Sequence, residues 1–436
     1  PLEYSTPTYG KSLVEKGNFS DIAGNPSADN ILKLRMMNII QGSAGTRYNP
    51  RASLTKQEAA TYIIRMIDKE KEALEKAAAM AKVGTKANYL ADNYAIGYIE
   101  EAIAQGIINN EDLREMETLS KAQTDAIESQ VKAEAKKQWM TLAQRDALRD
   151  EKIAAAKLQN KSMKSYISRQ DIALWLFRAL ELEEIPQKDI NIIYGYSDHD
   201  AIKSNRLAAV ETLLQKDIIQ GASKDKYNPT GDIKRAEAAD IFSKAIANYP
   251  EIFGITIGTA RLTSINNTYK TELSGIQQGN TYTMENFDGA EFSITTQGTD
   301  TFPVIQNGKV YDHNILRTGD TIEYGIRDGQ MLYGALGIYG FVQGNLSYYD
   351  GKDLIRIEDG QKNITELNIS SRSMITALGI PAKRQSLIVG QPVKALYRGN
   401  NLIQLDIMES VDYYHDVEYI DGIIKYMDLS GKIIKL

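Results

Sequence analysis

Two kinds of hydrophobic pattern divide the chain. Up to about residue 250, apolar residues recur with helical spacing among Ala, Lys and Glu, which predicts amphipathic helices. From about residue 255 onward, short segments rich in Thr, Tyr and β-branched residues alternate apolar and polar positions between Gly turns, which predicts β-strands. We therefore expect a multidomain α+β chain, mainly helical at first and then built of small all-β, barrel-like domains.

The helical part contains an internal repeat. One copy opens with Phe19-Ser20-Asp21 and another with Tyr196-Ser197-Asp198, and each continues into an amphipathic segment. The two segments finish alike, as Asn-Ile-Ile-Gln-Gly at 38–42 and Asp-Ile-Ile-Gln-Gly at 217–221. The closing glycines stand where a helix C-cap needs a left-handed residue.

Each copy then has a loop and a second helix. The loops end in Tyr-Asn-Pro, at 48–50 and 227–229, and the helices begin through 54–60 and 233–239. Each copy is therefore predicted to fold as helix, loop, helix. We assign residues 1–68 to repeat 1 and residues 183–250 to repeat 3.

A split copy, repeat 2, lies between them at 69–182. Ile39 precedes Lys56 by 17 positions and Ile218 precedes Arg235 by 17, whereas Ile107 precedes Arg169 by 62. The extra residues, at about 111–164, are rich in Ala, Lys, Glu and Gln and lack Pro and Gly. They predict inserted helices with solvated charged faces.

The β-rich part repeats as well. Residues 316–329 align without gaps on 387–400, each with a Gly turn, a strand and a hairpin turn. We expect one β domain at 255–339, a second at 340–410 and the start of a third at 417–436. Because the third unit stops after its first hairpin, we expect the chain to be part of a longer protein.

Composition narrows the functional classes. The chain has 436 residues, 42% hydrophobic residues, a net charge of −6 and no cysteine. Disulfides and thiolate chemistry are thereby excluded, and no basic stripe favours nucleic acid. No apolar run approaches the roughly 18 residues of a membrane span. The start, without Met or an apolar leader, suggests a processed N-terminus.

Together the repeats resemble the S-layer homology family, whose hallmark is an F-x-D start, a G-I-I-x-G helix end, an aromatic-x-Pro loop and a T-R-A-E helix start. The resemblance covers about residues 1–250, with three copies in order. It implies that the three repeats of one chain pack as a pseudo-threefold helical trimer. It also implies an extracellular protein of a cell wall or S-layer in a Gram-positive organism.

The resemblance also implies a ligand. In the family, grooves between repeats bind secondary cell-wall polysaccharide linked to peptidoglycan, often through a pyruvylated sugar whose carboxylate faces the T-R-A-E arginine. The matching residues here are Arg169, Arg235 and, with a change, Lys56. A guanidinium holds a carboxylate through two parallel hydrogen bonds and a lysine offers a point charge, so the Lys56 groove should be weaker. The insertion should remodel or cover one groove.

Three carboxylates follow these basic residues by two positions, namely Glu58, Asp171 and Glu237. They join the candidate polysaccharide site, but the first two also complete capping boxes with Thr55 and Ser168, so helix capping is the favoured alternative.

The remaining candidates for the polysaccharide site lie in loops. Asp21 and Asp198 either orient ligand hydroxyls or, as we favour, serve as cap or turn residues. Tyr48 and Tyr227 either stack on a sugar or anchor their loops. Gly42 and Gly221 complete the set.

Catalytic and metal-binding readings are not favoured. His199, His313 and His415 fall in different modules, and no nucleophile elbow, metalloprotease motif or phosphate loop is present. Asp198-His199-Asp200 is the densest set of possible ligands, yet it lies in a repeat-start loop. We expect no enzyme activity, cofactor or specific metal site, although calcium bridging acidic loops is compatible with the residue types.

The leading hypothesis is a wall-anchored structural protein whose β domains act as spacers or contact further copies in a two-dimensional lattice. One rival is the anchor region of a wall-bound hydrolase or protease with a catalytic domain beyond residue 436. Another is a module whose β domains bind a partner protein or glycan.

Overall fold

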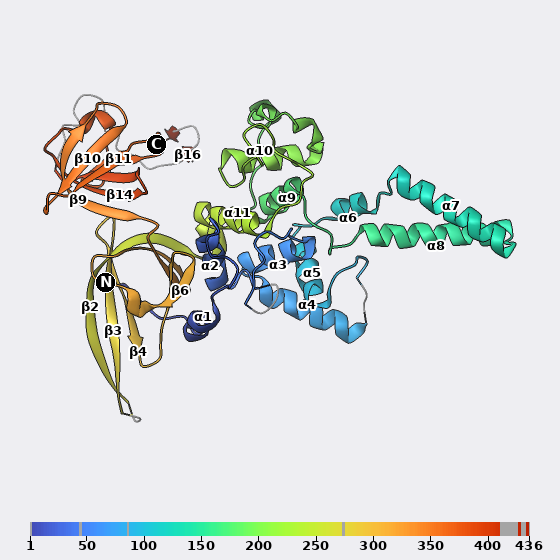
Figure 1. Cartoon of the computed structure of the whole chain (residues 1–436), viewed down its shortest axis with the longest axis horizontal. Helices are drawn as coiled ribbons and strands as arrows, with labels where there is room; N and C mark the ends of the chain where they lie inside the picture. The colour runs from blue at the N-terminus through green and yellow to red at the C-terminus, as the bar shows by residue number, and fades with distance from the viewer. Residues whose placement is uncertain are drawn as a thin grey trace. The chain divides into compact units, whose positions relative to one another are not determined.

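The computed structural model describes residues 2–42, 46–84, 87–272, 275–409, 426–428 and 433–435. The chain divides into two compact units, residues 1–284 with 291–336 and residues 285–290 with 337–436. Apart from strand β1 (Leu2–Tyr4), the strands of two β-sheets follow the helices along the sequence, so the predicted multidomain α+β class is confirmed (Figure 1).

Each repeat contributes a first and a second helix. The first helices are α2 (Ala28–Met36), α5 (Ile96–Ala104) and α10 (Leu207–Gln215), and the second helices are α3 (Lys56–Met66), α9 (Arg169–Ala179) and α11 (Arg235–Asn248). Helix α1 (Gly10–Lys16) precedes the first helix of repeat 1, and α4 (Glu70–Val83) opens the range assigned to repeat 2. Apolar residues of these helices form the buried core of this region.

Three backbone hydrogen bonds form a ring where the repeats meet. The amide of Leu54 donates to Ile233, that of Ile233 to Ile167, and that of Ile167 to Leu54, at N···O distances of 2.8, 3.2 and 2.9 Å. All three side chains are fully buried. Each residue comes shortly before the second helix of its repeat, so the ring marks a pseudo-threefold centre.

The N-termini of the second helices also dock in a cycle, which runs in the opposite direction to the ring. Their first amides are orphan donors within the helix and need acceptors elsewhere. The first two amides of each helix donate to carbonyls in a loop of another repeat. The amides of residues 56 and 57 donate to the carbonyls of 165 and 163, those of 169 and 170 to 231 and 229, and those of 235 and 236 to 52 and 50. Repeat 2 takes its full place in this cycle despite its insertion.

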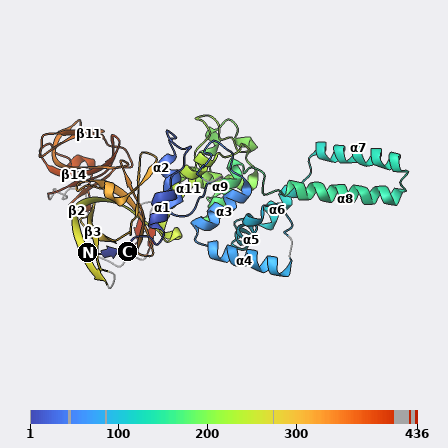
Figure 2. The same ribbon diagram turned by 60° about the horizontal axis from the view of Figure 1, so that its bottom comes forward.

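The insertion is helical. It contains α6 (Asn110–Glu117), α7 (Lys121–Gln138) and α8 (Leu142–Asn160), and each helix begins with a capping box. Helices α7 and α8 lie side by side as a hairpin (Figure 2). Only Ile127 and Val131 are buried along the hairpin, which matches the predicted solvated faces.

The prediction that Gly42 and Gly221 are left-handed C-caps is wrong for Gly221. The left-handed residues are Asn38, Gly106 and Asp217, each the second residue after the end of a first helix. Gly221 has no φ in that region; instead, an added Cβ would lie 2.4 Å from the Tyr196 ring. Close packing, not chain reversal, requires this glycine.

The first sheet has the strand order β1-β4-β3-β2-β7-β8-β5-β6. Its strands are β1 (Leu2–Tyr4), β2 (Thr256–Glu272), β3 (Gly275–Asn286), β4 (Glu291–Gln297), β5 (Pro303–Gln306), β6 (Lys309–Asp312), β7 (Thr321–Arg327) and β8 (Gln330–Leu336). The first residues of the range assigned to repeat 1 therefore join a sheet whose other strands follow repeat 3. A buried pair, Lys33 with Glu323 at 2.5 Å, also links repeat 1 to this sheet.

The second sheet has the order β11-β10-β9-β14-β15-β12-β13. Its strands are β9 (Gly340–Tyr349), β10 (Leu354–Asp359), β11 (Ile364–Asn368), β12 (Met374–Ala377), β13 (Ile380–Pro381), β14 (Pro392–Arg398) and β15 (Asn401–Ile407). Hairpin β14–β15 repeats β7–β8, with a register shift at the equivalent position. The aligned segments thus fold alike, as predicted.

Of the expected third unit, the described residues form a strand pair, β16 (Tyr426–Asp428) with β17 (Ile433–Lys435). The rest of 417–436 lies outside the described residues.

Candidate functional site

Three interfaces between repeats carry the basic residues that the sequence singled out. Lys56, Arg169 and Arg235 each occupy the first position of a second helix. We name the three interfaces after these residues. The two arginines are only 5% and 2% exposed, so their charges need partners inside the protein.

At the Arg235 interface, every guanidinium nitrogen has a partner. Nε donates to the Tyr48 carbonyl at 2.8 Å, and Nη2 donates to the Tyr62 hydroxyl at 2.9 Å and to the Gln41 carbonyl at 3.4 Å. Nη1 pairs with Glu58. Burial by itself would lower the pKa of Arg235, but Tyr62 and Glu58 outweigh it and raise that pKa. This arginine is fully engaged within the chain.

At the Arg169 interface, the equivalent contacts are fewer. Nη1 donates to the Gln220 carbonyl at 3.0 Å and Nη2 pairs with Glu237. Ile241 stands where the other interface has Tyr62, and it offers no hydroxyl. The buried Nε has no hydrogen-bond partner among the described residues.

Arg169 also lines a cavity of about 140 Å³. It is lined by Arg169, Ile218, Gln220, Gly221, Glu237, Asp240, Ile241 and Lys244. A buried donor without a partner costs about 1–3 kcal/mol, so an oxygen-bearing ligand that supplied the missing acceptor would be favoured here.

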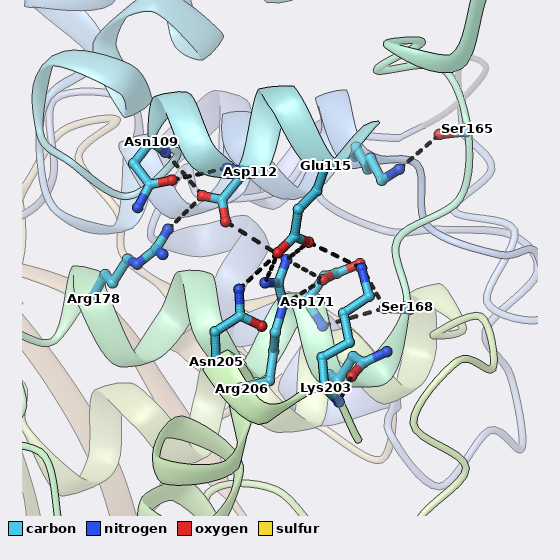
Figure 3. Close-up of polar contacts among 12 residues, drawn as sticks. Asn109, Asp112, Glu115, Ser165, Ser168, Asp171, Arg178, Lys203, Asn205 and Arg206 are labelled. Atoms are coloured by element: carbon cyan, nitrogen blue, oxygen red, sulfur yellow. Dashed lines mark hydrogen bonds and ion pairs between the residues drawn. The ribbon is translucent and has the colours of Figure 1, made fainter. Parts of the chain in front are cut away.

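The Lys56 interface is remodelled by the insertion. Asn110 stands where the other repeats have Gly42 and Gly221, and α6 begins there in place of the loop. The Lys56 ammonium donates to Ser165 at 3.1 Å, and burial lowers its pKa although Asp171 opposes the shift. Asp171 itself accepts from Arg206 at 3.3 Å (Figure 3).

The two loop tyrosines are completely buried. The Tyr48 hydroxyl donates to the Arg235 carbonyl at 2.9 Å, and the Tyr227 hydroxyl donates to the Arg169 carbonyl at 3.3 Å. Neither ring offers a face to a sugar, so the structure favours the loop-anchor alternative. In repeat 2, Lys161 stands at this position and pairs with Glu117.

The repeat-start aspartates hold the same loops. Asp21 accepts the amides of Tyr48 and Asn49, and Asp198 accepts those of Tyr227 and Asn228, all at 2.8–2.9 Å. Burial tends to raise the pKa of each aspartate, but these hydrogen bonds outweigh it and lower the pKa. Both carboxylates thus act as structural acceptors.

The three helix-start carboxylates differ in their roles. Glu58 completes a capping box with Thr55 and also pairs with Arg235. Asp171 is hydrogen-bonded to the capping Ser168. Glu237 follows Lys234, which makes no side-chain cap, and it pairs with Arg169. Pairing across an interface, which the spacing alone did not predict, is a role that Glu58 and Glu237 share.

The structure adds residues that sequence reasoning missed. Lys203, Asn205 and Arg206 contact Glu115 of the insertion. An alignment of the three repeats ahead of their first helices would have revealed them. At these positions repeat 1 has Gly24, Pro26 and Ser27, and repeat 2 has Asp92, Tyr94 and Ala95. Only repeat 3 carries cations there.

The other candidates do not converge on a second site. Gly42 is partly exposed, and the ring of His199 contacts the Tyr196 carbonyl at 2.8 Å. His415 lies outside the described residues. Across the described ranges, no three His, Cys, Asp or Glu side chains gather closely enough to hold a metal ion. Within those ranges, no helix combines the length and apolarity that crossing a membrane requires.

Comparison with known families agrees with this arrangement. The sequence model of the S-layer homology domain matches residues 18–60 and 195–239, which fall in repeats 1 and 3. The search of curated proteins gave no match. The chain therefore carries S-layer homology domains. Domains of this family anchor proteins to the cell wall and generally bind its polysaccharide, and their presence implies a protein associated with the cell surface or cell wall.

Proposed function

We propose that the helical region anchors the protein non-covalently by binding secondary cell-wall polysaccharide at its inter-repeat interfaces, and that the Arg169 interface is the principal site. The observation that carries this proposal is the buried Nε of Arg169, which has no partner among the described residues and belongs to a side chain that lines a cavity. The Arg235 guanidinium, by contrast, is satisfied by the chain itself.

An acidic sugar suits this interface. A carboxylate oxygen would accept from Nε and from the Lys244 ammonium, since both residues line the cavity. A cavity of about 140 Å³ accommodates a small acidic substituent, such as a pyruvyl group, rather than a whole sugar ring. Glu237 and Asp240 in the same lining would repel a bare carboxylate and accept hydrogen bonds from sugar hydroxyls. The ligand should therefore combine one carboxylate with neighbouring hydroxyls.

The β domains have no assigned chemistry in this proposal. Their two hairpins, β7–β8 and β14–β15, repeat the same registers, as expected for serial modules. They would extend outward from the wall as spacers or contact other copies in a surface layer. No catalysis is assigned to the residues of this chain.

Co-sedimentation with purified Gram-positive walls tests the anchoring function. The whole chain should pellet with untreated walls and remain in solution after chemical removal of the secondary polysaccharide. Arg169→Ala should weaken pelleting, with folding checked by circular dichroism. Binding that survives both polysaccharide removal and the substitution would overturn the proposal and leave the repeats with another partner.

A further inference from the structure

Two features that occur once each in the three repeats meet at the Lys56 interface. One is helix α6, which repeat 2 has in place of the glycine loop. The other is the polar segment 203–206 of repeat 3, which has no cationic counterpart in repeats 1 and 2. Figure 3 shows that the side chains of this segment reach Glu115 on α6. Neither feature is needed for the hydrogen-bonded ring, which the three repeats form alike.

Three donors converge on the Glu115 carboxylate. The Lys203 ammonium lies 3.0 Å from it, the Asn205 amide nitrogen 2.7 Å, and the Arg206 guanidinium 2.9 Å. Arg206 is 3% exposed and is held in place by Asp171 at 3.3 Å. Burial by itself would raise the pKa of Glu115, but the donors outweigh it and lower that pKa, so the carboxylate is ionised at neutral pH.

The surroundings of Glu115 are balanced in charge and contain space. A cavity of about 230 Å³ is lined by three cations and three carboxylates, together with Met116, Asn160 and Trp175. The cations are Lys56, Lys203 and Arg206, and the carboxylates are Asp112, Glu115 and Asp171. Without Glu115, three cations would face two carboxylates. The excess positive charge would attract an anion into the cavity.

We propose that Lys203, Asn205 and Arg206 form a carboxylate-binding site that the chain fills with its own Glu115, and that an external carboxylate takes this site when Glu115 is absent or withdrawn. A lysine, an amide and a guanidinium form a suitable donor set for one carboxylate. Helix α6 thus closes the Lys56 interface with an internal ligand. The identity of the natural competitor, an acidic wall glycan, rests on the proposed function. The binding of a carboxylate by Lys203, Asn205 and Arg206 does not rest on that function.

Chemical rescue tests the site on the whole chain. Melting temperatures of wild type, Glu115→Ala and Glu111→Ala are compared in 100 mM sodium acetate and 100 mM sodium chloride at pH 7.5. Glu111 is the matched control, because it lies exposed on the same helix. For a dissociation constant on the order of 10 mM, acetate should raise the melting temperature of Glu115→Ala by about 2–4 °C.

The other proteins should show the same melting temperature in both salts. Glu115→Gln should resemble them, because the amide fills the same volume. Adding Lys203→Ala to Glu115→Ala should reduce the acetate effect. If Glu115→Ala melts too low for a transition to be read, line broadening of ¹³C-acetate at 10 °C compares the same variants. Equal behaviour of Glu115→Ala and Glu111→Ala in acetate would overturn the proposal.

A second measurement separates this inference from the anchoring function. If both proposals hold, Glu115→Ala should bind one more acidic glycan chain per protein than wild type does in a titration with released wall polysaccharide. Acetate rescue without any glycan binding would support the carboxylate site and refute the anchoring function. Glycan binding without acetate rescue would support the anchoring function and refute the carboxylate site.

Discussion

Replacing Arg169 by lysine should separate ligand binding from stability at the interfaces. The substitution keeps the positive charge and removes the planar fork of donors. A lysine at this position can reach the Gln220 carbonyl or Glu237, but not both in the arrangement that the arginine has. It also lacks a counterpart of Nε, the donor that we assign to the ligand.

The contacts set the expected magnitudes. A hydrogen bond to a charged group contributes about 1.5–3 kcal/mol, so losing the Nε donor should weaken wall binding about 10- to 150-fold. Stability should fall by about 1–2 kcal/mol, since one of two internal contacts is lost. Arg235→Lys is the matched control. It breaks up four internal contacts and should cost about 3 kcal/mol of stability, with less than a threefold effect on wall affinity.

Co-sedimentation isotherms with purified walls would measure affinity, and urea unfolding would measure stability. Both variants must be compared well below their melting temperatures, so that the folded fraction is the same. A loss of wall affinity in Arg235→Lys that equals or exceeds that in Arg169→Lys would refute the assignment of the Arg169 interface as the principal site.

Three further predictions concern stability. Lys33→Met should lower the free energy of unfolding in urea by about 3–5 kcal/mol, because it leaves Glu323 buried without its cation. Adding Glu323→Gln should restore much of the lost stability, and additive losses in the double variant would contradict the pairing. The pKa values of Asp21 and Asp198 are below the ordinary 3.8, so their contribution to folding stability is present above pH 3.8 and disappears as the pH falls through the lower pKa values of the folded state. Asp21→Asn should therefore flatten the dependence of the unfolding free energy on pH between pH 5 and 2. An unchanged slope would refute this. Gly221→Ala should lower stability by about 1–3 kcal/mol because of the clash with a tyrosine ring, and a melting temperature unchanged from wild type would show that the loop yields freely.

Repetition made much of the fold predictable. The two intact copies display their helix ends, loops and helix starts at equal spacing, and hairpin β14–β15 repeats β7–β8 at a constant offset along the chain. Local signals also located helix starts, since Thr55 and Glu58 form the capping box that their spacing predicts. Such features depend on residues a few positions apart, which a sequence displays directly.

The roles of individual site residues were less accessible. Tyr48 and Tyr227 looked equally suited to stacking on a sugar and to packing, and only the fold shows that both are fully buried. Gly221 looked like a helix cap because it follows a helix, but the left-handed turn had already occurred at Asp217. Burial and close approach depend on neighbours from distant parts of the chain.

The sequence by itself determined the helical and β-rich parts, the repeats, the insertion in repeat 2 and the basic residue at the start of each second helix. Only the tertiary structure decided how the three interfaces differ. Arg235 is satisfied by Tyr62 and Glu58, and Arg169 retains a donor without a partner among the described residues. At the Lys56 interface, Glu115 of the insertion accepts from Arg206. The physical reason is that a buried charge is defined by its acceptors. Here those acceptors come from other repeats, up to 194 positions away along the chain.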